Sequence, residues 1–303
     1  MENLDQQTLH FSQENLWVLN FCLAVIMFGI ALELTVADFK RLLTRPRAIT
    51  VGLLAQVVLL PLVTYLIVLL IQPTQSIALG MILVASCPSG TLSNLLSVLA
   101  GGNGALSVSL TALTTLVSFI TLPLNFSLWS GVYLRGQTTL QAVEIPVFQI
   151  LTTLVFIVLI PLLLGMTWAS WRPGITKAIL KPIRVISVII FLVFIVVALG
   201  NNFDNFYRYI HLLFMIVLIH NAAAYSLGYA VATGLGLNYK DRRTISLDTG
   251  IQNSGLALIL IFNFFDGRGG MAFLAGWWGI WDMISGLLLA WGMSRWRILN
   301  TNT

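Results

Sequence analysis

The sequence predicts an all-α membrane protein with nine transmembrane helices, and three observations support this fold class. Of the 303 residues, 58% are hydrophobic and only 9% are charged, with a mean hydropathy of +0.91. A soluble domain carries about 25% charged residues. Long apolar segments also follow one another along the chain, and the basic residues gather in alternate loops. A chain of this composition cannot cover a water-exposed surface, so we expect it to face lipid.

Each predicted helix corresponds to one apolar segment. A helix needs about 20 predominantly apolar residues to cross the hydrocarbon core of a bilayer. The third and eighth segments are the weakest as continuous spans, because polar residues, glycine and proline interrupt both of them. The nine segments are 15–34, 47–71, 75–100, 104–133, 143–170, 178–199, 207–234, 241–265 and 270–294.

The lysine and arginine residues support this count and set an orientation. Nine spans place the two termini on opposite sides. With the N-terminus outside, only Arg135, Arg208 and Arg268 fall in outside segments, and the other thirteen basic residues fall inside. This bias follows the positive-inside rule and predicts a cell-membrane protein with a cytoplasmic C-terminus. The inside residues are Lys40, Arg41, Arg45, Arg47, Arg172, Lys177, Lys181, Arg184, Lys240, Arg242, Arg243, Arg295 and Arg297.

Two of the segments are interrupted near their middle. The third reads SIALGMILVASCPSGTLSNLLSVLA, in which Pro88 and Gly90 disfavour a continuous helix. The eighth reads RTISLDTGIQNSGLALILIFNFF and is interrupted around Gly250, Asn253 and Gly255. Non-helical backbone at this depth is costly unless it faces protein or a watery cavity. We therefore expect two discontinuous helices.

The positions of the two interruptions also predict inverted repeats. Counted from the ends, segments six to nine mirror segments one to four, and their directions across the membrane are opposite. Paired interruptions in the two halves of a chain are a pointer to the binding site of a transporter. The freed carbonyls and the half-helix ends at such a site can hold cations and substrate.

Two carboxylates lie within the predicted spans. Asp248 follows the Arg242–Arg243 pair by about six residues, and Asp282 lies near the middle of the ninth segment. An ionisable residue inside a span indicates a functional site. Asp282 could instead be a protonated or hydrogen-bonded packing residue. The hydroxyl residues of the fourth segment, including Ser107 and Thr111, could likewise serve only close helix packing.

The polar groups around Asp248 favour a monovalent cation. They offer oxygen ligands and few carboxylates, a set that suits Na⁺ better than a divalent ion. A bound ion would also lower the cost of burying the aspartate. We expect one or two Na⁺ ions, an organic anion as substrate, and lipid as the surroundings. We expect no nucleic acid, because the net charge of +5 is scattered over loops, and no oligomer is required.

Other functions remain open at this level. A proton-coupled or uncoupled carrier could use Asp248 and Asp282 as titrating groups. A receptor would bind the same ligand without transporting it. An enzyme would need a buried nucleophile and base, and the sequence offers no such pair. We therefore expect no catalytic residues.

Three stretches of the sequence are similar to a known family. MFGIALELTVADFKRLLTRPRAITVGLLAQVVLLP, CPSGTLSN and GIQNSGLA resemble the bile acid:sodium symporter family, and the resemblance extends from Leu16 to Trp296. It implies a panel domain of segments one, five and six. It also implies a core domain of segments two to four and seven to nine, in which two discontinuous helices cross.

The resemblance also implies ligands by motif position. A first sodium site would involve Ser93, Asn94, Ser107, Thr111 and Asp248. A second would use Gln56, Asp248, Gln252 and the carbonyl groups of Thr249 and Ile251. The residues expected to contribute to substrate binding are Asn253, Asp282, Pro88, Gly90, His220 and Asn221.

This chain departs from the family pattern at two of these positions. Asp248 stands where the family usually has glutamate, so the carboxylate is one methylene shorter and could fail to reach both sodium sites. The second site would be the weaker one. Asp282 stands where related bacterial sequences often have histidine, and it could couple a proton or cation or repel an anionic substrate.

Overall fold

The computed structural model describes residues 13–32, 34, 46–136, 145–200 and 203–300. Lys40, Arg41 and Arg45, counted above as inside residues, lie outside this part of the chain. The described part is helical and contains no strand, although Ser89 and Gln252 form an isolated bridge. The elements are α2 (Gln13–Ala31), α4 (Pro46–Leu53), η1 (Leu54–Leu59), α5 (Leu60–Ile71), α6 (Gln75–Ser86), α7 (Leu92–Leu99), α8 (Gly104–Arg135), α9 (Val147–Leu154), η2 (Val155–Leu159), α10 (Ile160–Trp171), α11 (Pro173–Gly200), α12 (Phe203–Gly234), α13 (Tyr239–Gly250), α14 (Ser254–Phe264) and α15 (Gly269–Asn300).

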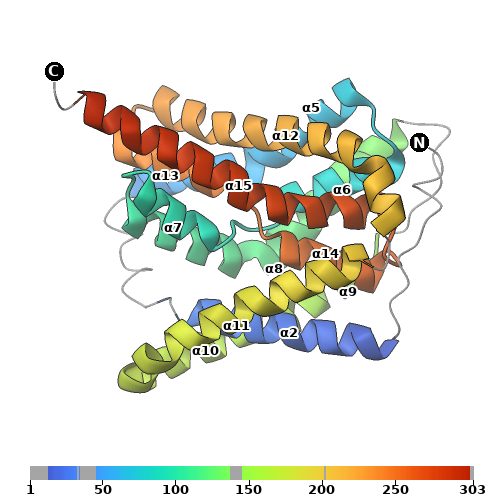
Figure 1. Cartoon of the computed structure of the whole chain (residues 1–303), viewed down its shortest axis with the longest axis horizontal. Coiled ribbons are helices and arrows are strands. Elements are labelled where there is room, and N and C mark those ends of the chain that lie inside the picture. Colours follow the sequence, from blue (N-terminus) through green and yellow to red (C-terminus); the bar gives the residue numbers. More distant parts are fainter. Residues whose placement is uncertain (1–12, 33, 35–45, 137–144, 201–202, 301–303) are drawn as a thin grey trace.

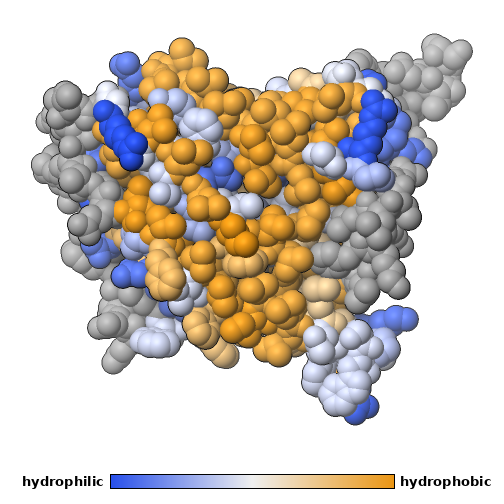
Figure 2. All heavy atoms as spheres, turned by 180° about the vertical axis from the view of Figure 1, so that it is seen from behind, coloured by the Kyte–Doolittle hydropathy of each residue, from blue (hydrophilic) through white to orange (hydrophobic). Residues whose placement is uncertain are grey.

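The described helices have the length and apolarity of a membrane protein. Five continuous stretches are long and apolar enough to span a bilayer, and three shorter apolar helices accompany them. Figure 2 shows a broad apolar surface with hydrophilic side chains gathered towards the left and right edges, where helix ends lie. The chain is therefore an all-α membrane protein, and the count of nine spans stays a prediction. The five stretches are Pro46–Ile71, Gly104–Arg135, Val147–Trp171, Tyr207–Gly234 and Gly269–Arg295.

The helix α2 packs with α10 and α11 in a layer of its own along the lower edge of Figure 1. The contact between α2 and α10 is close because Gly165 has no side chain: a Cβ there would lie 2.5 Å from the Cβ of Ala31. The segments α9 and η2 continue into α10 and belong with this layer. The remaining helices form the larger body above it, in which α14 contacts α2 and α8 contacts α9 and η2.

The half-helices α6 and α14 lie in the interior of the larger body. Every residue of α6 is buried, and α14 is buried from Ser254 to Phe262. Each has only 11 or 12 residues, too few to cross a bilayer unaided. Their apolar side chains pack with Phe273 and Trp278 of α15 in the main hydrophobic core. Protein therefore surrounds the points at which these helices end.

Two π-helical segments interrupt otherwise continuous helices, and each ends two residues before a proline. In η1 the N–H of Leu60 donates to Ala55 O, five residues back, and Pro61 follows. Proline has no N–H for the carbonyl four residues back, which here is Val57. The side chain of Asn125 in α8 donates to Val57 O at 2.9 Å instead. A side chain thus replaces a missing backbone donor next to Gln56.

Candidate functional site

The two predicted interruptions exist and lie against each other. The first runs from the end of α6 at Ser86 to the start of α7 at Leu92, and the second from Gly250 to Ser254. Gly90 N donates to Ile251 O at 3.0 Å, and Asn253 N donates to Pro88 O at 2.9 Å. Each break therefore satisfies backbone groups of the other, which makes non-helical backbone tolerable at this depth.

The boundaries of the breaks differ slightly from the predicted ones. Helix resumes at Leu92, so Ser93 and Asn94 lie in the first turn of α7, and Gly255 lies within α14. Two glycines are needed for close approach. A Cβ on Gly90 would lie 3.0 Å from Gln252 O, and one on Gly250 would lie 2.1 Å from the ring of Tyr225.

A cluster of oxygen atoms surrounds Asp248; we call it the aspartate cluster (Ser89, Ser93, Asn94, Ser107, Thr111 and Asp248). Asp248 Oδ1 accepts from Ser93 Oγ, from Ser107 Oγ at 2.9 Å and from Ser89 Oγ at 3.5 Å. The residues come from α7, α8, α13 and the first break, and five of them are buried. The residues expected to form the first sodium site are therefore close together, with Ser89 as an addition.

The aspartate cluster has fewer hydrogens than its close oxygen pairs require. Ser107 Oγ lies 2.9 Å from both Asn94 Oδ1 and Asp248 Oδ1, yet a hydroxyl carries one hydrogen. Thr111 Oγ1 lies 3.1 Å from the same Asn94 oxygen and 3.4 Å from Ser93 Oγ. Asp248 Oδ2 is buried and has no hydrogen-bond partner. Several acceptors thus face one another in the interior, an arrangement that a small cation would stabilise.

The other predicted oxygen ligands are Gln56, Gln252 and the carbonyls of Thr249 and Ile251, and the structure adds the carbonyl of Cys87. We call these groups the glutamine cluster. Gln56 Nε2 donates to Gln252 Oε1 at 2.9 Å, and Gln252 Nε2 lies 3.4 Å from Gln56 Oε1. Gln252 Nε2 also donates to Thr249 O at 2.8 Å. In the described part of the chain, no hydrogen bond joins Asp248 to the side chain of Gln56 or Gln252.

Asp282 of α15 holds the second break through hydrogen bonds. Its Oδ2 accepts from Gln252 N at 3.0 Å, and its Oδ1 accepts from Asn221 Nδ2 at 3.1 Å. The same Asn221 nitrogen donates to Gly250 O at 2.9 Å. The pair therefore holds backbone groups on both sides of Ile251, and both oxygens of the buried Asp282 are engaged within the protein.

The remaining predicted substrate residues have different surroundings. Asn253 begins α14, and its Oδ1 accepts from Leu256 N at 3.0 Å as an N-cap. His220 is buried against two other helices: its Nε2 lies 2.6 Å from Thr64 Oγ1, and its ring meets the Trp278 ring edge-on. Pro88 and Gly90 lie in the first break itself.

Comparison of this sequence with known proteins identifies its family. The profile described as the Sodium Bile acid symporter family matches residues 20–208. A Bacillus subtilis (strain 168) protein named as an uncharacterized sodium-dependent transporter, YocS, is 31% identical over 274 residues, covering 88% of this chain and 80% of the relative. The chain belongs to the sodium bile acid symporter family.

Relatives in this symporter family extend to animals. The human P3 protein is 31% identical over 268 residues, which cover 85% of this chain and 53% of that protein, so the chain spans about half its length. The human ileal sodium/bile acid cotransporter is 30% identical over 244 residues, covering 80% of this chain and 68% of the relative. The family and these relatives are named largely as transporters, and none is named as an enzyme.

The sequence did not predict the contacts that hold α7 and α13 together. Arg243, placed at the membrane edge by its position, is fully buried and donates to Ala100 O. Asn103 N donates to Thr244 Oγ1 at 2.7 Å, and Asn103 Nδ2 donates to Asp241 Oδ1 at 2.7 Å. These bonds tie the end of α7 to the start of α13, so the two helices that carry Ser93 and Asp248 are held as one unit.

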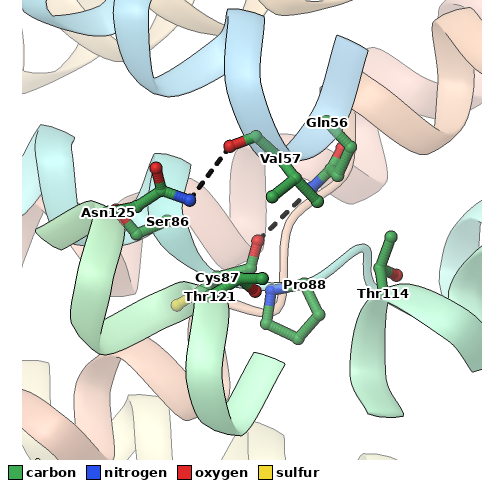
Figure 3. Close-up of a pocket in the computed structure, with 8 residues that line it drawn as sticks. All are labelled: Gln56, Val57, Ser86, Cys87, Pro88, Thr114, Thr121 and Asn125. Carbon is green, nitrogen blue, oxygen red and sulfur yellow. Dashed lines mark hydrogen bonds between the residues drawn. The ribbon is translucent and has the colours of Figure 1, made fainter. Parts of the chain in front are cut away.

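A small polar cavity lies beside the first break (Figure 3). Its volume is about 10 Å³, roughly room for one water molecule. Among the residues that line it, Gln56 Nε2 donates to Cys87 O at 3.3 Å, and Asn125 Nδ2 donates to Val57 O at 2.9 Å.

Among the described residues, no group of three or more His, Cys, Asp or Glu side chains could hold a metal ion.

Proposed function

We propose that this chain is a secondary transporter of the cell membrane that couples Na⁺ to the uptake of a small organic anion. The observation that carries this proposal is the aspartate cluster, a buried carboxylate among neutral oxygens at the point where two helix breaks meet. The names of the relatives, which include a sodium-dependent transporter and a sodium/bile acid cotransporter, support the same function.

The aspartate cluster supplies what Na⁺ prefers. The ion is a hard cation and binds oxygen ligands, here the Asp248 carboxylate, the Asn94 carbonyl and the hydroxyls of Ser93, Ser107 and Thr111. Ion binding neutralises Asp248, and its charge then costs less in a low-dielectric interior. The hydroxyl hydrogens can turn away from the ion, because each Ser or Thr hydroxyl rotates freely.

The substrate anion would bind at the breaks, next to the ion. Both α7 and α14 begin there, and a helix N-terminus carries a positive partial charge that favours an anionic group. The side chain of Asn253 caps α14, whereas no side chain caps the first turn of α7. Pro88, Gly90 and Asn253 would lie nearest to the anionic group. Cation and anion at adjacent positions strengthen each other's binding, and this coupling is reciprocal.

Transport would follow alternating access between two bodies. The panel would consist of α2, α9–α10 and α11, and the core of the other helices, giving nine spans built as inverted repeats with the N-terminus outside. The layer of α2, α10 and α11 in Figure 1 supports this division. The core would move against the panel and expose the breaks to each side in turn.

The decisive experiment measures sodium dependence directly. We expect small organic acids to raise the thermal unfolding midpoint of the purified protein more strongly when Na⁺ is present. The acid identified in this way should then enter proteoliposomes with ²²Na⁺. Equal uptake with choline in place of sodium would exclude the coupling, and uptake driven by a pH gradient without Na⁺ would favour a proton-coupled carrier.

A matched pair of variants locates the coupling at the cluster. We expect Asp248→Asn to abolish the sodium effect, because the neutral amide removes the carboxylate that accepts hydrogen bonds from these hydroxyls. Asp266→Asn, on an exposed turn between α14 and α15, serves as control and should retain it. A full sodium effect in Asp248→Asn would place the ion elsewhere.

A further inference from the structure

We infer that the buried charge of Arg243, at the far end of α7, balances Asp248 when no ion is bound and limits how tightly the aspartate cluster binds Na⁺. The inference rests on the proposed function and adds to it a positioning residue that does not touch the ion. It also gives a reason for an arginine in the interior of a membrane protein.

Arg243 is a buried cation that forms no ion pair with any described residue. Its side chain is fully buried, and its guanidinium donates to Ala100 O and to the hydroxyl group of Tyr239. Arg243 Cζ lies 4.0 Å from the centre of the Tyr239 ring, and Nε is buried without a hydrogen-bond partner. A guanidinium keeps its charge in proteins. These neutral contacts therefore leave a full positive charge in the interior, which is costly unless a negative charge compensates it.

Asp248 supplies the opposite charge on the same helix. It follows Arg243 by five residues, which is about 7.5 Å along the axis of α13. Asp241 is closer to Arg243 in sequence, but its oxygens accept from the amide groups of Asn103 and Asn238. Asp248 Oδ1 accepts only from hydroxyl groups in the described part of the chain, and its Oδ2 has no partner. Each of the two buried charges thus lacks a close counter-ion.

The short helix α7 connects these two charges in the favourable direction. Asp248 accepts from Ser93 in the first turn of α7, and Arg243 donates to the carbonyl of Ala100, the C-terminal cap. These two contact points are seven residues apart, or about 10 Å along the helix. A helix carries positive partial charge at its N-terminus and negative partial charge at its C-terminus. The carboxylate and the guanidinium therefore each lie at the end of α7 that stabilises them.

A cation bound in the aspartate cluster would feel the charge of Arg243 through α7. The residues at both ends of this path are buried, so protein and not water separates the charges. At an effective dielectric constant of about 20, two unit charges about 10 Å apart change a binding constant on the order of tenfold. Arg243 thus stabilises the ion-free core and weakens sodium binding by about this factor. Such a limit favours release of the ion after each transport step.

Equilibrium binding of ²²Na⁺ to the purified protein tests the effect on affinity. We expect Arg243→Gln to lower the half-saturating Na⁺ concentration about tenfold, because the opposing charge is gone. Tyr239→Phe is the matched control: it removes the hydroxyl group that Arg243 contacts, keeps the charge, and should leave the affinity near its wild-type value. Weaker or unchanged sodium binding in folded Arg243→Gln protein, or an equal gain in Tyr239→Phe, would overturn the inference. Wild-type protein without saturable sodium binding would instead refute the proposed function.

Thermal unfolding in sodium-free buffer tests the charge balance without any ion. Arg243→Gln should lower the unfolding midpoint less in an Asp248→Asn background than in the wild type, because the opposite charge is then absent. Loss of the contacts to Ala100 O and Tyr239 occurs in both backgrounds and cancels in this comparison. If Arg243→Gln alone does not fold, the double variant should fold. Additive effects, or a double variant that also fails to fold, would overturn the inference.

Discussion

Asp248 is stable in the protein interior because hydroxyl groups from two other helices and the first break reach the same carboxylate oxygen. Of these, Ser107 has a double role, since its Oγ lies 2.9 Å from both Asp248 Oδ1 and Asn94 Oδ1. It connects the only carboxylate of the cluster to its only amide oxygen. Removal of this one oxygen therefore affects both charged and neutral ligands of the proposed ion.

We predict that Ser107→Ala weakens sodium binding about tenfold, which corresponds to about 1.4 kcal/mol and matches the loss of one hydrogen-bonding oxygen next to a charge. The measurement is the Na⁺ concentration that half-saturates ²²Na⁺ binding. Ser118→Ala is the matched control, because Ser118 lies buried on the same helix and donates only to Thr115 O. Equal affinity in the two variants would remove Ser107 from the ion site.

At the scale of single residues, the sequence predicted the aspartate cluster better than the support around it. The motifs CPSGTLSN and GIQNSGLA place much of the two breaks in two short stretches, and the resemblance added Ser107 and Thr111. By contrast, the sequence left Asp282 open between a substrate residue and a hydrogen-bonded packing residue, and did not indicate its bond to the backbone of the second break, 30 residues away in sequence. Such a contact depends on how α15 packs against α13, which no local pattern records.

At the scale of elements, the interruptions were predictable and the π-helices were not. Pro88 and Gly90 indicate a break by their own backbone chemistry, whatever surrounds them. Pro61 and Pro161 follow apolar helical runs in the same way, yet the helices continue through them. The difference lies in distant partners, because a helix can pass a proline when another group satisfies the carbonyl that the proline leaves free. For Pro61 this group is Asn125, 68 residues away from Val57.

We predict that Asn125→Leu lowers the stability of the protein by about 1–3 kcal/mol, because Val57 O would be left without a donor in the interior. The same substitution in a Pro61→Ala background should cost less than half as much, since the backbone at position 61 would then supply the N–H that proline lacks. The measurement is a double-mutant cycle on unfolding in detergent. Additive effects in this cycle would show that Asn125 acts independently of Pro61.

At the scale of the whole molecule, a polar contact between described residues joins the α2 layer to the body that holds the breaks. Asn20 in α2 and Asn263 in α14 form a reciprocal amide pair, with nitrogen–oxygen distances of 3.1 and 2.8 Å. Asn263 is further fixed by its bond to Ile259 O at 2.8 Å. If the core moves against the panel during transport, this pair must separate in each cycle, whereas contacts within either body persist.

We therefore predict that a covalent link between positions 20 and 263 stops transport and preserves ion binding. The variant carries Asn20→Cys and Asn263→Cys in a background in which Cys22 and Cys87, both free thiols, are replaced by alanine. A short bis-methanethiosulfonate reagent should abolish sodium-dependent uptake of the acid found by thermal shift, and a reducing agent should restore it. The ²²Na⁺ binding of the linked protein in detergent should change less than about threefold, because all helices of the aspartate cluster belong to the proposed core.

The two single-cysteine variants provide the control for this experiment. Asn20→Cys or Asn263→Cys alone, in the same background and treated with the same reagent, carries the modification without a bond between α2 and α14. Each should therefore keep most of its uptake, because the two bodies stay free to move. Single variants that lose uptake as fully as the pair would indicate blockage by the reagent itself. Uptake that continues in the linked pair would mean that α2 and α14 move together, and the division into panel and core would then have to be drawn elsewhere.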